Sequence, residues 1–281
     1  MSKKILKIAL AVDIDNTLTP PRLPLEKEMA DMLKRLRVPF FVAAGSHLSL
    51  LRKQFFKPLY KFGFCEQFDA FLSNGAIHYH CDYSNKMSIE LVSKFKIREH
   101  LGRTDYNYLI KKLTDTLDME KYKLPPSLKV LDGRVVNRVS MINLCPIGRK
   151  NQEDSDARCN RENFVGFDRA TGYREKILGH LNQELSTLIG TKQLKITLGG
   201  QTSFDIGIVG EDKTKPVRTL LENGFERVVF IGDALFEGGN DAAITEFIKT
   251  WPPGSKCPVE AIQISSRHET IDILQKLQFL D

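Results

Sequence analysis

Short apolar runs alternate with amphipathic stretches along the first part of the chain. The apolar, β-branched run Ile8–Val12 predicts a buried strand that stops at Asp13. Strands that alternate with helices of ordinary length favour right-handed crossovers and a parallel sheet. The next predicted elements are a helix at Leu25–Leu36, a strand at Pro39–Ala43, a helix at His47–Leu59 and a strand at Phe68–Leu72.

The middle of the chain has a different pattern. Asn74-Gly75 predicts a hairpin turn at the sheet edge. Runs of helices followed by hairpin-like strands then indicate an inserted α+β module. Its predicted elements are helices at Glu90–Leu101 and Tyr106–Leu117, strands at Val135–Val139 and Met141–Leu144, a polar loop at Lys150–Asn163, a helix at Thr171–Leu188, and strands at Gln193–Leu198 and Ser203–Val209.

After Gly210 the alternation of strand and helix returns. A helix is predicted at Lys213–Asn223, a strand at Arg227–Ile231, and a last strand at Val259–Ile264 before a C-terminal helix. The sequence therefore predicts an α/β protein. Its Rossmann-like core, with a parallel sheet, is formed by residues 1–81 and 211–281, and residues 84–209 form the inserted α+β domain.

Composition narrows the class of protein. The chain has 281 residues, of which 42% are hydrophobic and 27% charged, which is typical of a soluble globular protein. No apolar run approaches the roughly 20 residues of a membrane span, and no secretory signal is expected. Five scattered cysteines without a CxxC pair disfavour zinc and disulfides and favour a cytoplasmic location.

The formal charge of +6 is compatible with nucleic acid or with a small anionic substrate. The lysines and arginines are spread along the chain, and no RNA- or DNA-binding motif accompanies them. We therefore expect neither nucleic acid nor a membrane as partner.

Two acids stand where the first strand ends. Asp13 and Asp15 follow the apolar run directly, at the sheet edge where ligands of open α/β sheets bind. Mg²⁺ takes carboxylate and carbonyl oxygens, and beside it one acid can attack an electrophile while the other moves protons. The alternative is a turn rich in aspartate that caps a helix.

Three further features fall at strand ends or helix starts of the split core. Ser46 follows the second strand, where a hydroxyl and exposed N–H groups can hold phosphate. Lys213 starts the first helix after the insert, and Asp233 can complete a Mg²⁺ site with Asn240 and Asp241 a loop away. The alternatives are helix caps for Ser46 and Asp233 and a surface charge for Lys213.

Together these residues resemble the haloacid dehalogenase superfamily of phosphoryl-transfer enzymes and, more narrowly, its eukaryotic-type phosphomannomutases. The resemblance spans nearly the whole chain. It rests on the segments Asp13–Arg22, Asn143–Arg149, Gly199–Asp205, Gly232-Asp233 and Gly238–Asp241.

The resemblance implies a cap domain that closes over a Mg²⁺ site. It makes Asp13 the nucleophile and Asp15 the acid/base, with Ser46 and Lys213 as further catalytic residues. Mg²⁺ is expected on Asp13, the carbonyl of Asp15 and Asp233. The residues expected to bind the hexose phosphate are Arg22 from the core and Arg138, Arg149, Arg161 (with Arg158 as the alternative), Ser203 and Asp205 from the cap.

The implied reaction interconverts mannose 6-phosphate and mannose 1-phosphate, which serves GDP-mannose biosynthesis, with a hexose 1,6-bisphosphate as activator and intermediate. A homodimer formed through the caps is also implied. Guanidinium groups suit a second phosphate, because they bind it with two parallel hydrogen bonds.

The chain departs from the family at Asn16, where Gly is usual, and at His47, where Asp is usual. One alternative is a sugar-phosphate phosphatase of the same superfamily with the same Asp pair. The other, a catalytically silent binding protein, is disfavoured because both acids, Ser46, Lys213 and Asp233 are retained.

Overall fold

The computed structural model describes residues 7–149, 155–236 and 239–280. The chain divides into two compact units. The first unit comprises the chain up to Lys94 and from Gly210 onward, and the second unit comprises Phe95–Val209. Residues 150–154 of the predicted polar loop and Gly238 of the quoted motif lie outside the described residues.

The first unit is built on a sheet with the strand order β11-β10-β1-β2-β3-β4-β5. The strands from β11 to β3 run parallel, whereas β4 and β5 are antiparallel to their neighbours. The strands are β1 (Ile8–Val12), β2 (Phe40–Ala43), β3 (Gln67–Leu72), β4 (Ile77–Asp82), β5 (Ser88–Lys94), β10 (Arg227–Gly232) and β11 (Val259–Gln263).

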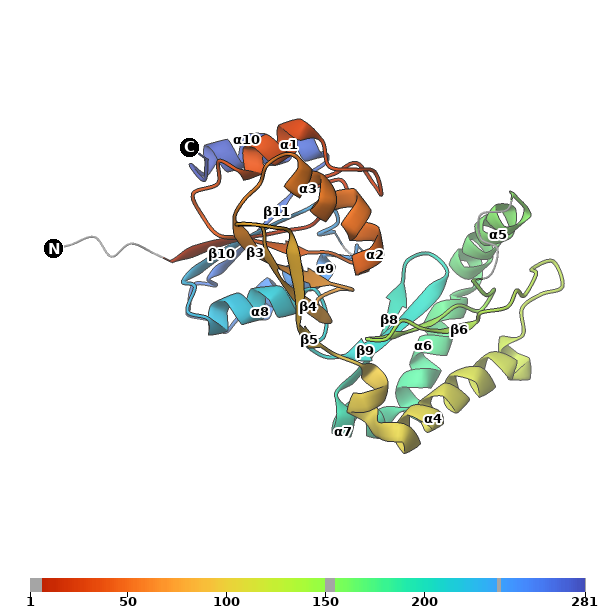
Figure 1. Ribbon diagram of the computed structural model, residues 1–281. Coiled ribbons are helices and arrows are strands. Elements are labelled where there is room, and N and C mark those ends of the chain that lie inside the picture. The colour runs from red at the N-terminus through yellow and green to blue at the C-terminus, as the bar shows by residue number, and fades with distance from the viewer. Residues whose placement is uncertain (1–6, 150–154, 237–238, 281) are drawn as a thin grey trace. The chain divides into compact units, whose positions relative to one another are not determined.

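Helices cover both faces of this sheet (Figure 1). Leu10 and Val12 of β1 pack into one core, and Ala9 and Ala11 pack into the core on the opposite face, which explains the continuous apolar run. On the first face lie α1 (Lys27–Leu33), α2 (Leu48–Leu51), the π-helical turn η1 (Arg52–Phe56), α3 (Lys57–Lys61) and α10 (Arg267–Lys276); on the second lie α8 (Thr214–Glu222) and α9 (Ala242–Lys249).

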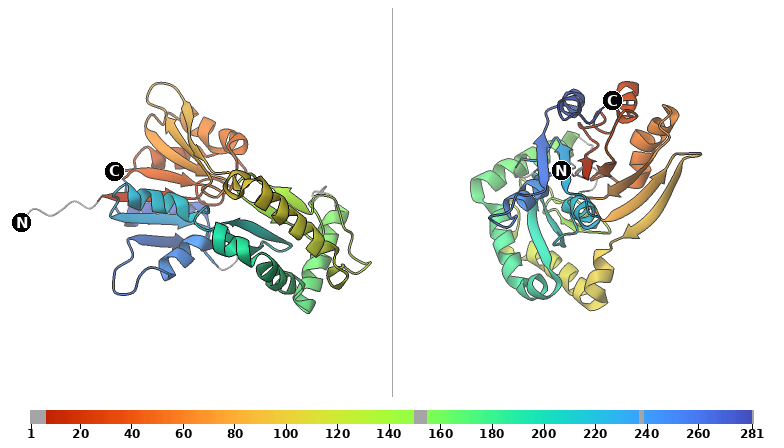
Figure 2. Two further views of the ribbon diagram at one scale, coloured as in Figure 1. Left: turned by 90° about the horizontal axis from the view of Figure 1, so that it is seen from below. Right: turned by 90° about the vertical axis from the view of Figure 1, so that its left-hand side faces the viewer.

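The second unit has an antiparallel sheet in the order β6-β7-β9-β8, with helices packed against it (Figure 2). Ile142 and Leu144 of β7 enter its core, so Asn143 between them points to the other face. The elements are α4 (Ile97–Asp118), η2 (Glu120–Tyr122), β6 (Val135–Asn137), β7 (Ile142–Leu144), α5 (Ser155–Thr171), α6 (Tyr173–Glu184), α7 (Ser186–Lys192), β8 (Leu194–Gly199) and β9 (Ser203–Ile208).

The predicted fold class is confirmed by these two sheets. The predicted hairpin is present as well: β3 and β4 pair antiparallel across the turn at Ser73–Gly75. None of the helices in the described ranges is long and apolar enough to cross a bilayer.

The helix predicted at Glu90–Leu101 is wrong in its first half. Residues Ser88–Lys94 form β5, the edge strand, and α4 begins only at Ile97. Leu91 and Val92 are more than half exposed, and a register shift opposite His78/Tyr79 interrupts the alternation of buried and exposed positions. Pairing with β4 decides this segment, because its own pattern does not identify a strand. The second unit accordingly begins at Phe95, later than the predicted residue 84.

The polar loop predicted at Lys150–Asn163 is also wrong where the structure describes it. Helix α5 begins at Ser155 and continues to Thr171. Asn160, a buried polar residue, faces the body of the unit and bonds both backbone groups of Lys129. Because a polar residue takes a buried position here, this part of the helix lacks the regular spacing of apolar residues from which helices are predicted.

Two smaller differences concern breaks within helices and a helix that was not predicted. The predicted helix Thr171–Leu188 is two helices, α6 and α7, with Gly172 in the left-handed region before the first and Leu185 between them. Helix α9 follows Asp241 directly, in a segment for which no helix was predicted.

We expect Phe68→Ala to destabilise the first unit by about 3–5 kcal/mol, because a large buried ring would leave a cavity. Phe68 is 4% exposed, and its ring lies 4.9 Å from that of Phe40 and 5.4 Å from that of Tyr83. Urea unfolding followed by the fluorescence of Trp251, the single tryptophan, measures the effect in this unit.

The matched control is Leu91→Ala in the same sheet, at a side chain that is 57% exposed. It should change the free energy of unfolding by about 0.5 kcal/mol or less. Equal effects of the two substitutions would contradict the described core.

Candidate active site

The first acid of the predicted pair lies at the carboxyl end of the central strand. The backbone N–H of Asp13 donates to the carbonyl of Ile231 at 3.0 Å, which extends the pairing of β1 with β10 by one residue. Asp13 is 2% exposed. A carboxylate this deeply buried needs a charged partner or a metal ion.

A buried lysine supplies one such partner. Nζ of Lys213 lies 2.7 Å from Oδ1 of Asp13 and 2.5 Å from Oδ1 of Asp241. All three side chains are at most 3% exposed. The surface-charge alternative for Lys213 is therefore wrong, because the start of α8 points its side chain into the first unit.

Asp13, Asp233 and Asp241 form a carboxylate cluster, with one ligand atom of each within 4.8 Å of the others. Asp233 follows β10, and Asp241 precedes α9. Gly232 makes the close approach feasible, because a Cβ atom there would lie 2.5 Å from Oδ2 of Asp241. Asp241 is thus more central than predicted.

The charges in this cluster shift one another's protonation. Burial raises the pKa of Asp13 to about 7; Lys213 opposes this shift, and the negative charge of Asp241 adds to it. Burial works against the charge of Lys213, but the two aspartates outweigh it and raise its pKa. The lysine is therefore charged at neutral pH.

The donor set fits a hard divalent cation. Three carboxylates and one ammonium group leave two negative charges uncompensated when all are ionised. Oxygen ligands of this kind are those that Mg²⁺ prefers. Asn16 Nδ2 donates to Asp233 Oδ2 at 2.8 Å, and Gln263 Nε2 donates to the Asp233 carbonyl, so Asp233 is held in place from both sides.

Asp15 has a different environment. Its Oδ1 accepts from Gln54 Nε2 at 2.6 Å and from the backbone N–H of Arg22 at 2.8 Å. Its carboxylate is not a member of the carboxylate cluster, which leaves only its carbonyl as the predicted ligand. Gln54, 1% exposed on η1, was missed by the sequence analysis, because a glutamine inside a predicted helix carries no signal of its own.

The remaining predicted residues of the first unit lie in loops. Ser46 is half-buried just after β2, and its carbonyl accepts from Ser73 N–H at 3.1 Å. Gly45 is close to Asn240, whose amide nitrogen would lie 3.9 Å from a Cβ atom at the glycine. Arg22 is exposed, with a left-handed backbone at φ +57°. The structure thus brings Asn240 next to the Ser46 loop.

A second polar group lies on the second unit, around Arg149. Its Nη2 donates to Ser203 Oγ and its Nε to Asn143 Oδ1, each at 2.8 Å. Asn143 Nδ2 in turn donates to Asp205 Oδ1 at 2.7 Å. These bonds fix the guanidinium plane of Arg149, so the predicted residues Arg149, Ser203 and Asp205 do lie together.

Asn143 was not named as a site residue, although it belongs to the quoted motif. It lies between two buried apolar residues of β7 and faces Asp205 of β9 in register. A polar residue between two apolar ones on a central strand was the signal that could have identified it.

Two other arginines, Arg138 and Arg161, act electrostatically on Arg149, and we call the three the arginine cluster. Burial lowers the pKa of Arg149, and the positive charges of Arg138 and Arg161 act in the same direction. Arg138 is exposed just after β6, and Arg161 is half-buried on α5, where Arg158 is exposed. Positive charges that act on one another in this way favour the binding of an anion.

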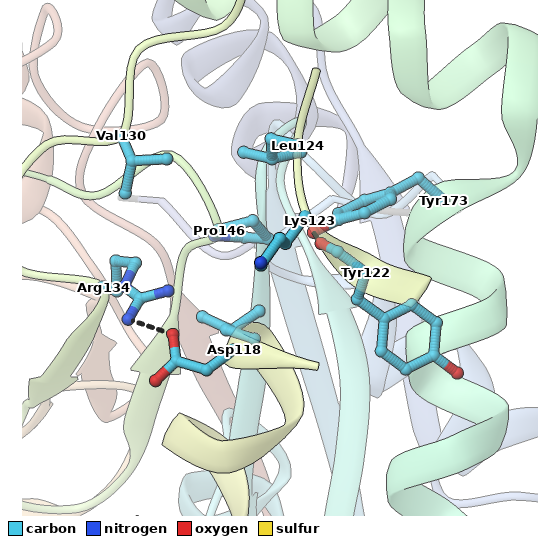
Figure 3. A pocket seen from close by; sticks show the side chains of 9 residues that line it. Asp118, Tyr122, Lys123, Leu124, Val130, Arg134, Pro146 and Tyr173 are labelled. Carbon is cyan, nitrogen blue, oxygen red and sulfur yellow. Dashed lines mark hydrogen bonds and ion pairs between the residues drawn. The ribbon is translucent and has the colours of Figure 1, made fainter. Parts of the chain in front are cut away.

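A pocket of about 280 Å³ lies elsewhere on the second unit (Figure 3). Its polar groups bond one another: Arg134 pairs with Asp118 at 2.7 Å, and Tyr173 OH donates to the carbonyl of Tyr122 at 2.7 Å. None of the predicted site residues lines this pocket, so it is not part of the candidate site.

Comparisons with known proteins point to one family. The family model described as eukaryotic phosphomannomutase matches residues 27–268. The chain is 30% identical to phosphomannomutase 2 of Dictyostelium discoideum over 83% of this chain and 84% of that protein. It is 31% identical to the phosphomannomutase of Spinacia oleracea over 87% of this chain and 88% of that protein.

Similar solved structures support the fold alone, because their sequence identity is low. The IMP-nucleotidase of Plasmodium falciparum gives a TM-score of 0.58 at 16% identity, and the match covers 98% of this chain and 63% of that chain. Trehalose-6-phosphate phosphatase of Aspergillus fumigatus gives 0.55 at 12% identity, with coverages of 96% and 92%.

We expect Lys213→Met to reduce the free energy of unfolding by about 3–5 kcal/mol in EDTA at pH 8, because it leaves two buried carboxylates without their cation. The loss should be smaller at pH 6. A carboxyl whose pKa is higher in the folded chain binds its proton there, so its contribution to stability falls as pH rises toward that pKa. Removing Lys213 should raise the pKa of Asp13 further, because the charge that opposes the shift is lost. Urea unfolding monitored by Trp251 at both pH values measures the difference.

Lys249→Met is the control for a lysine on the surface of the same unit. Lys249 is 66% exposed and lies 3.7 Å from Glu246, so its loss should change stability by about 0.5 kcal/mol or less at either pH. A pH-independent loss in Lys213→Met, no larger than that of the control, would contradict the buried ion pair.

Proposed function

The chain belongs to the eukaryotic phosphomannomutase family, and on this premise we propose that it interconverts mannose 6-phosphate and mannose 1-phosphate. The family and the class of enzyme predicted from the sequence are thereby confirmed. For this chain, the observation that carries the phosphoryl-transfer chemistry of the proposal is the buried Asp13 beside Lys213 in the carboxylate cluster.

Asp13 is the nucleophile in this proposal. One of its oxygens attacks the phosphorus of a hexose phosphate, the bond from phosphorus to the sugar oxygen breaks, and an aspartyl-phosphate forms. Lys213, 2.7 Å from Asp13, lowers the cost of the negative charge that collects around the transferring group.

Asp15 moves the proton. It donates a proton to the sugar oxygen that leaves and accepts one from the sugar hydroxyl that attacks in the reverse direction. Gln54 Nε2 and Arg22 N–H both donate to the same oxygen of Asp15, which leaves its second oxygen for this role. The two bonds orient the carboxylate before the substrate arrives.

Mg²⁺ is the expected ion, and Asp13, Asp233 and the carbonyl of Asp15 are the groups that would hold it. When bound, it supplies positive charge that stabilises the phosphoryl oxygens. Asp241 holds Lys213 through Oδ1, and the backbone N–H of Ala234 donates to its Oδ2 at 3.3 Å. Asp241 therefore acts by fixing the lysine.

A mutase must also hold a phosphate that is not reacting. The arginine cluster with Ser203 and Asp205 suits that task, because guanidinium groups stay charged and that of Arg149 is fixed by the neutral groups of Asn143 and Ser203. A hexose 1,6-bisphosphate is then the intermediate, because one of its phosphates is held there in each half-reaction while the other reacts. The same compound is the activator. Arg22 contacts the substrate from the first unit.

A sugar-phosphate phosphatase with the same Asp13 and Asp15 is the alternative, with water in place of the sugar hydroxyl. The second anion site favours the mutase, because hydrolysis of a monophosphate does not require it. We further propose a cytoplasmic homodimer, formed through the second unit, that supplies GDP-mannose biosynthesis. Light scattering at several protein concentrations tests the dimer.

We expect isomerisation of mannose 1-phosphate that depends on Mg²⁺ and on a hexose 1,6-bisphosphate, because Asp13 must first be phosphorylated. A coupled assay for mannose 6-phosphate, run with and without the bisphosphate and with EDTA, measures it. Inorganic phosphate as the main product would replace the mutase by the phosphatase.

Asp13→Asn should lower kcat by at least about a thousandfold, because the amide cannot form the aspartyl-phosphate. Unfolding should remain cooperative, since Lys213 keeps Asp241 as its partner. Asp31→Asn, at an exposed acid paired with Lys27 and Lys34, is the control and should leave kcat unchanged. Turnover near that of the control would show that Asp13 is not the nucleophile.

A further inference from the structure

The turn between β8 and β9 carries one side of the second polar group. Residues 200–202 form this turn, and Ser203 begins β9 directly after it. Ser203 Oγ donates to the carbonyl of Gly199 at 2.7 Å while it accepts from Arg149. A Cβ atom at Gly199 would lie 2.6 Å from the carboxylate carbon of Asp205, so a larger residue there would displace that carboxylate. The position of this turn therefore sets where Ser203 and Asp205 stand.

A residue outside the predicted site holds the turn from the other side. Arg174 Nη1 donates to the carbonyl of Gly200 at 2.9 Å and to the carbonyl of Ser203 at 3.3 Å. Ser203 is thus held twice, through its carbonyl by Arg174 and through its hydroxyl by Arg149. Arg174 lies in the first turn of α6, far from the turn in sequence.

Asp168 fixes Arg174 in turn. Its Oδ2 accepts from Arg174 Nε and its Oδ1 from Arg174 backbone N–H, both at 2.7 Å. The side chains of Arg174 and Asp168 are only 12% and 14% exposed, so water competes little for these bonds. Gly172, at φ +62°, separates α5 from α6 and turns the chain so that the two residues meet.

We infer that Arg174 and Asp168 are positioning residues for the phosphate held on the second unit. This inference rests on the proposed function for its substrate, but the restraint on the turn is independent of it. The chain of contacts runs from Asp168 to Arg174, from there to Ser203, and from Ser203 to Arg149.

Arginine is specifically required at this position. Its fork reaches a carboxylate through Nε and two carbonyls through Nη1 at once, whereas lysine has a single nitrogen on a flexible stem. Arg174→Lys can keep an ion pair with Asp168 but cannot also hold both carbonyls. Arg174→Lys therefore separates the effect of the side chain's charge from the effect of its geometry.

The test compares Arg174→Met and Arg174→Lys with the unsubstituted chain. We expect KM for mannose 1-phosphate to rise about tenfold with kcat within about twofold, because the lost interaction is remote from the reacting bond. On a logarithmic scale, the rise in KM caused by Arg174→Lys should be more than half of the rise caused by Arg174→Met. Arg149→Ala, which removes the guanidinium group itself, sets the upper limit of the expected rise in KM.

Arg134→Met is the matched control. Arg134 forms an arginine–aspartate pair at the same distance of 2.7 Å in the same unit, but it lines the pocket of Figure 3 and makes no hydrogen bond to the turn between β8 and β9 among the described residues. Its KM should stay within about twofold of the unsubstituted chain.

Amide hydrogen exchange provides a readout that does not depend on activity. Exchange at residues 199–204 should become faster in Arg174→Met and stay unchanged in Arg134→Met. If the unsubstituted chain does not isomerise hexose phosphates, the proposed function fails, while faster exchange in Arg174→Met alone still supports the restraint. Unchanged KM and unchanged exchange would overturn the inference. If Arg174→Met does not fold, Arg174→Lys decides by the same two measurements.

Discussion

The buried ion pair of Lys213 with Asp13 and Asp241 is the interaction on which the first unit depends. It joins the end of β1, the start of α8 and the residue before α9, which are distant in sequence. Because the chain leaves this unit after Lys94 and returns at Gly210, Asp13 meets Lys213 only when both segments have folded together, whereas Lys213 and Asp241 belong to the same segment. The charge arrangement proposed for phosphoryl transfer is therefore also the contact that closes the discontinuous core.

The two units hold their positive charges in different ways. Lys213 is buried and paired with acids, so it balances charge within a site that also suits a divalent cation. Arg149 is held by the neutral groups of Asn143 and Ser203, so most of its charge stays available for an anion. This difference matches the roles proposed for them, since one phosphate reacts and the other is only held.

Residues whose role depends on their place in the strand order could be predicted. Asp13 and Asp233 end parallel strands, and their meeting follows from the topology. Residues that act through a local bend could not: Gln54 reaches Asp15 from a π-helical turn, and Arg174 reaches Ser203 because Gly172 breaks a helix. Strand β5 and the start of α5 were missed for a related reason, because cross-strand pairing and Asn160 determine them more than the apolar period does.

The two alternatives of mutase and phosphatase share everything that the first unit contains. In both alternatives the roles proposed for Asp13, Asp15 and Lys213 serve attack on phosphorus, whether water or a sugar hydroxyl follows, so the first unit cannot distinguish the two. In the proposed mutase the distinction lies in the second unit, because a second phosphate held there would keep a sugar hydroxyl at hand as acceptor and give it a high effective concentration against water. How precisely the second phosphate is positioned then affects which acceptor reacts as well as the affinity for the substrate. A restraint such as Arg174 on Ser203 is accordingly most valuable in an enzyme that must pass the phosphoryl group to the sugar, because a loosened grip favours water.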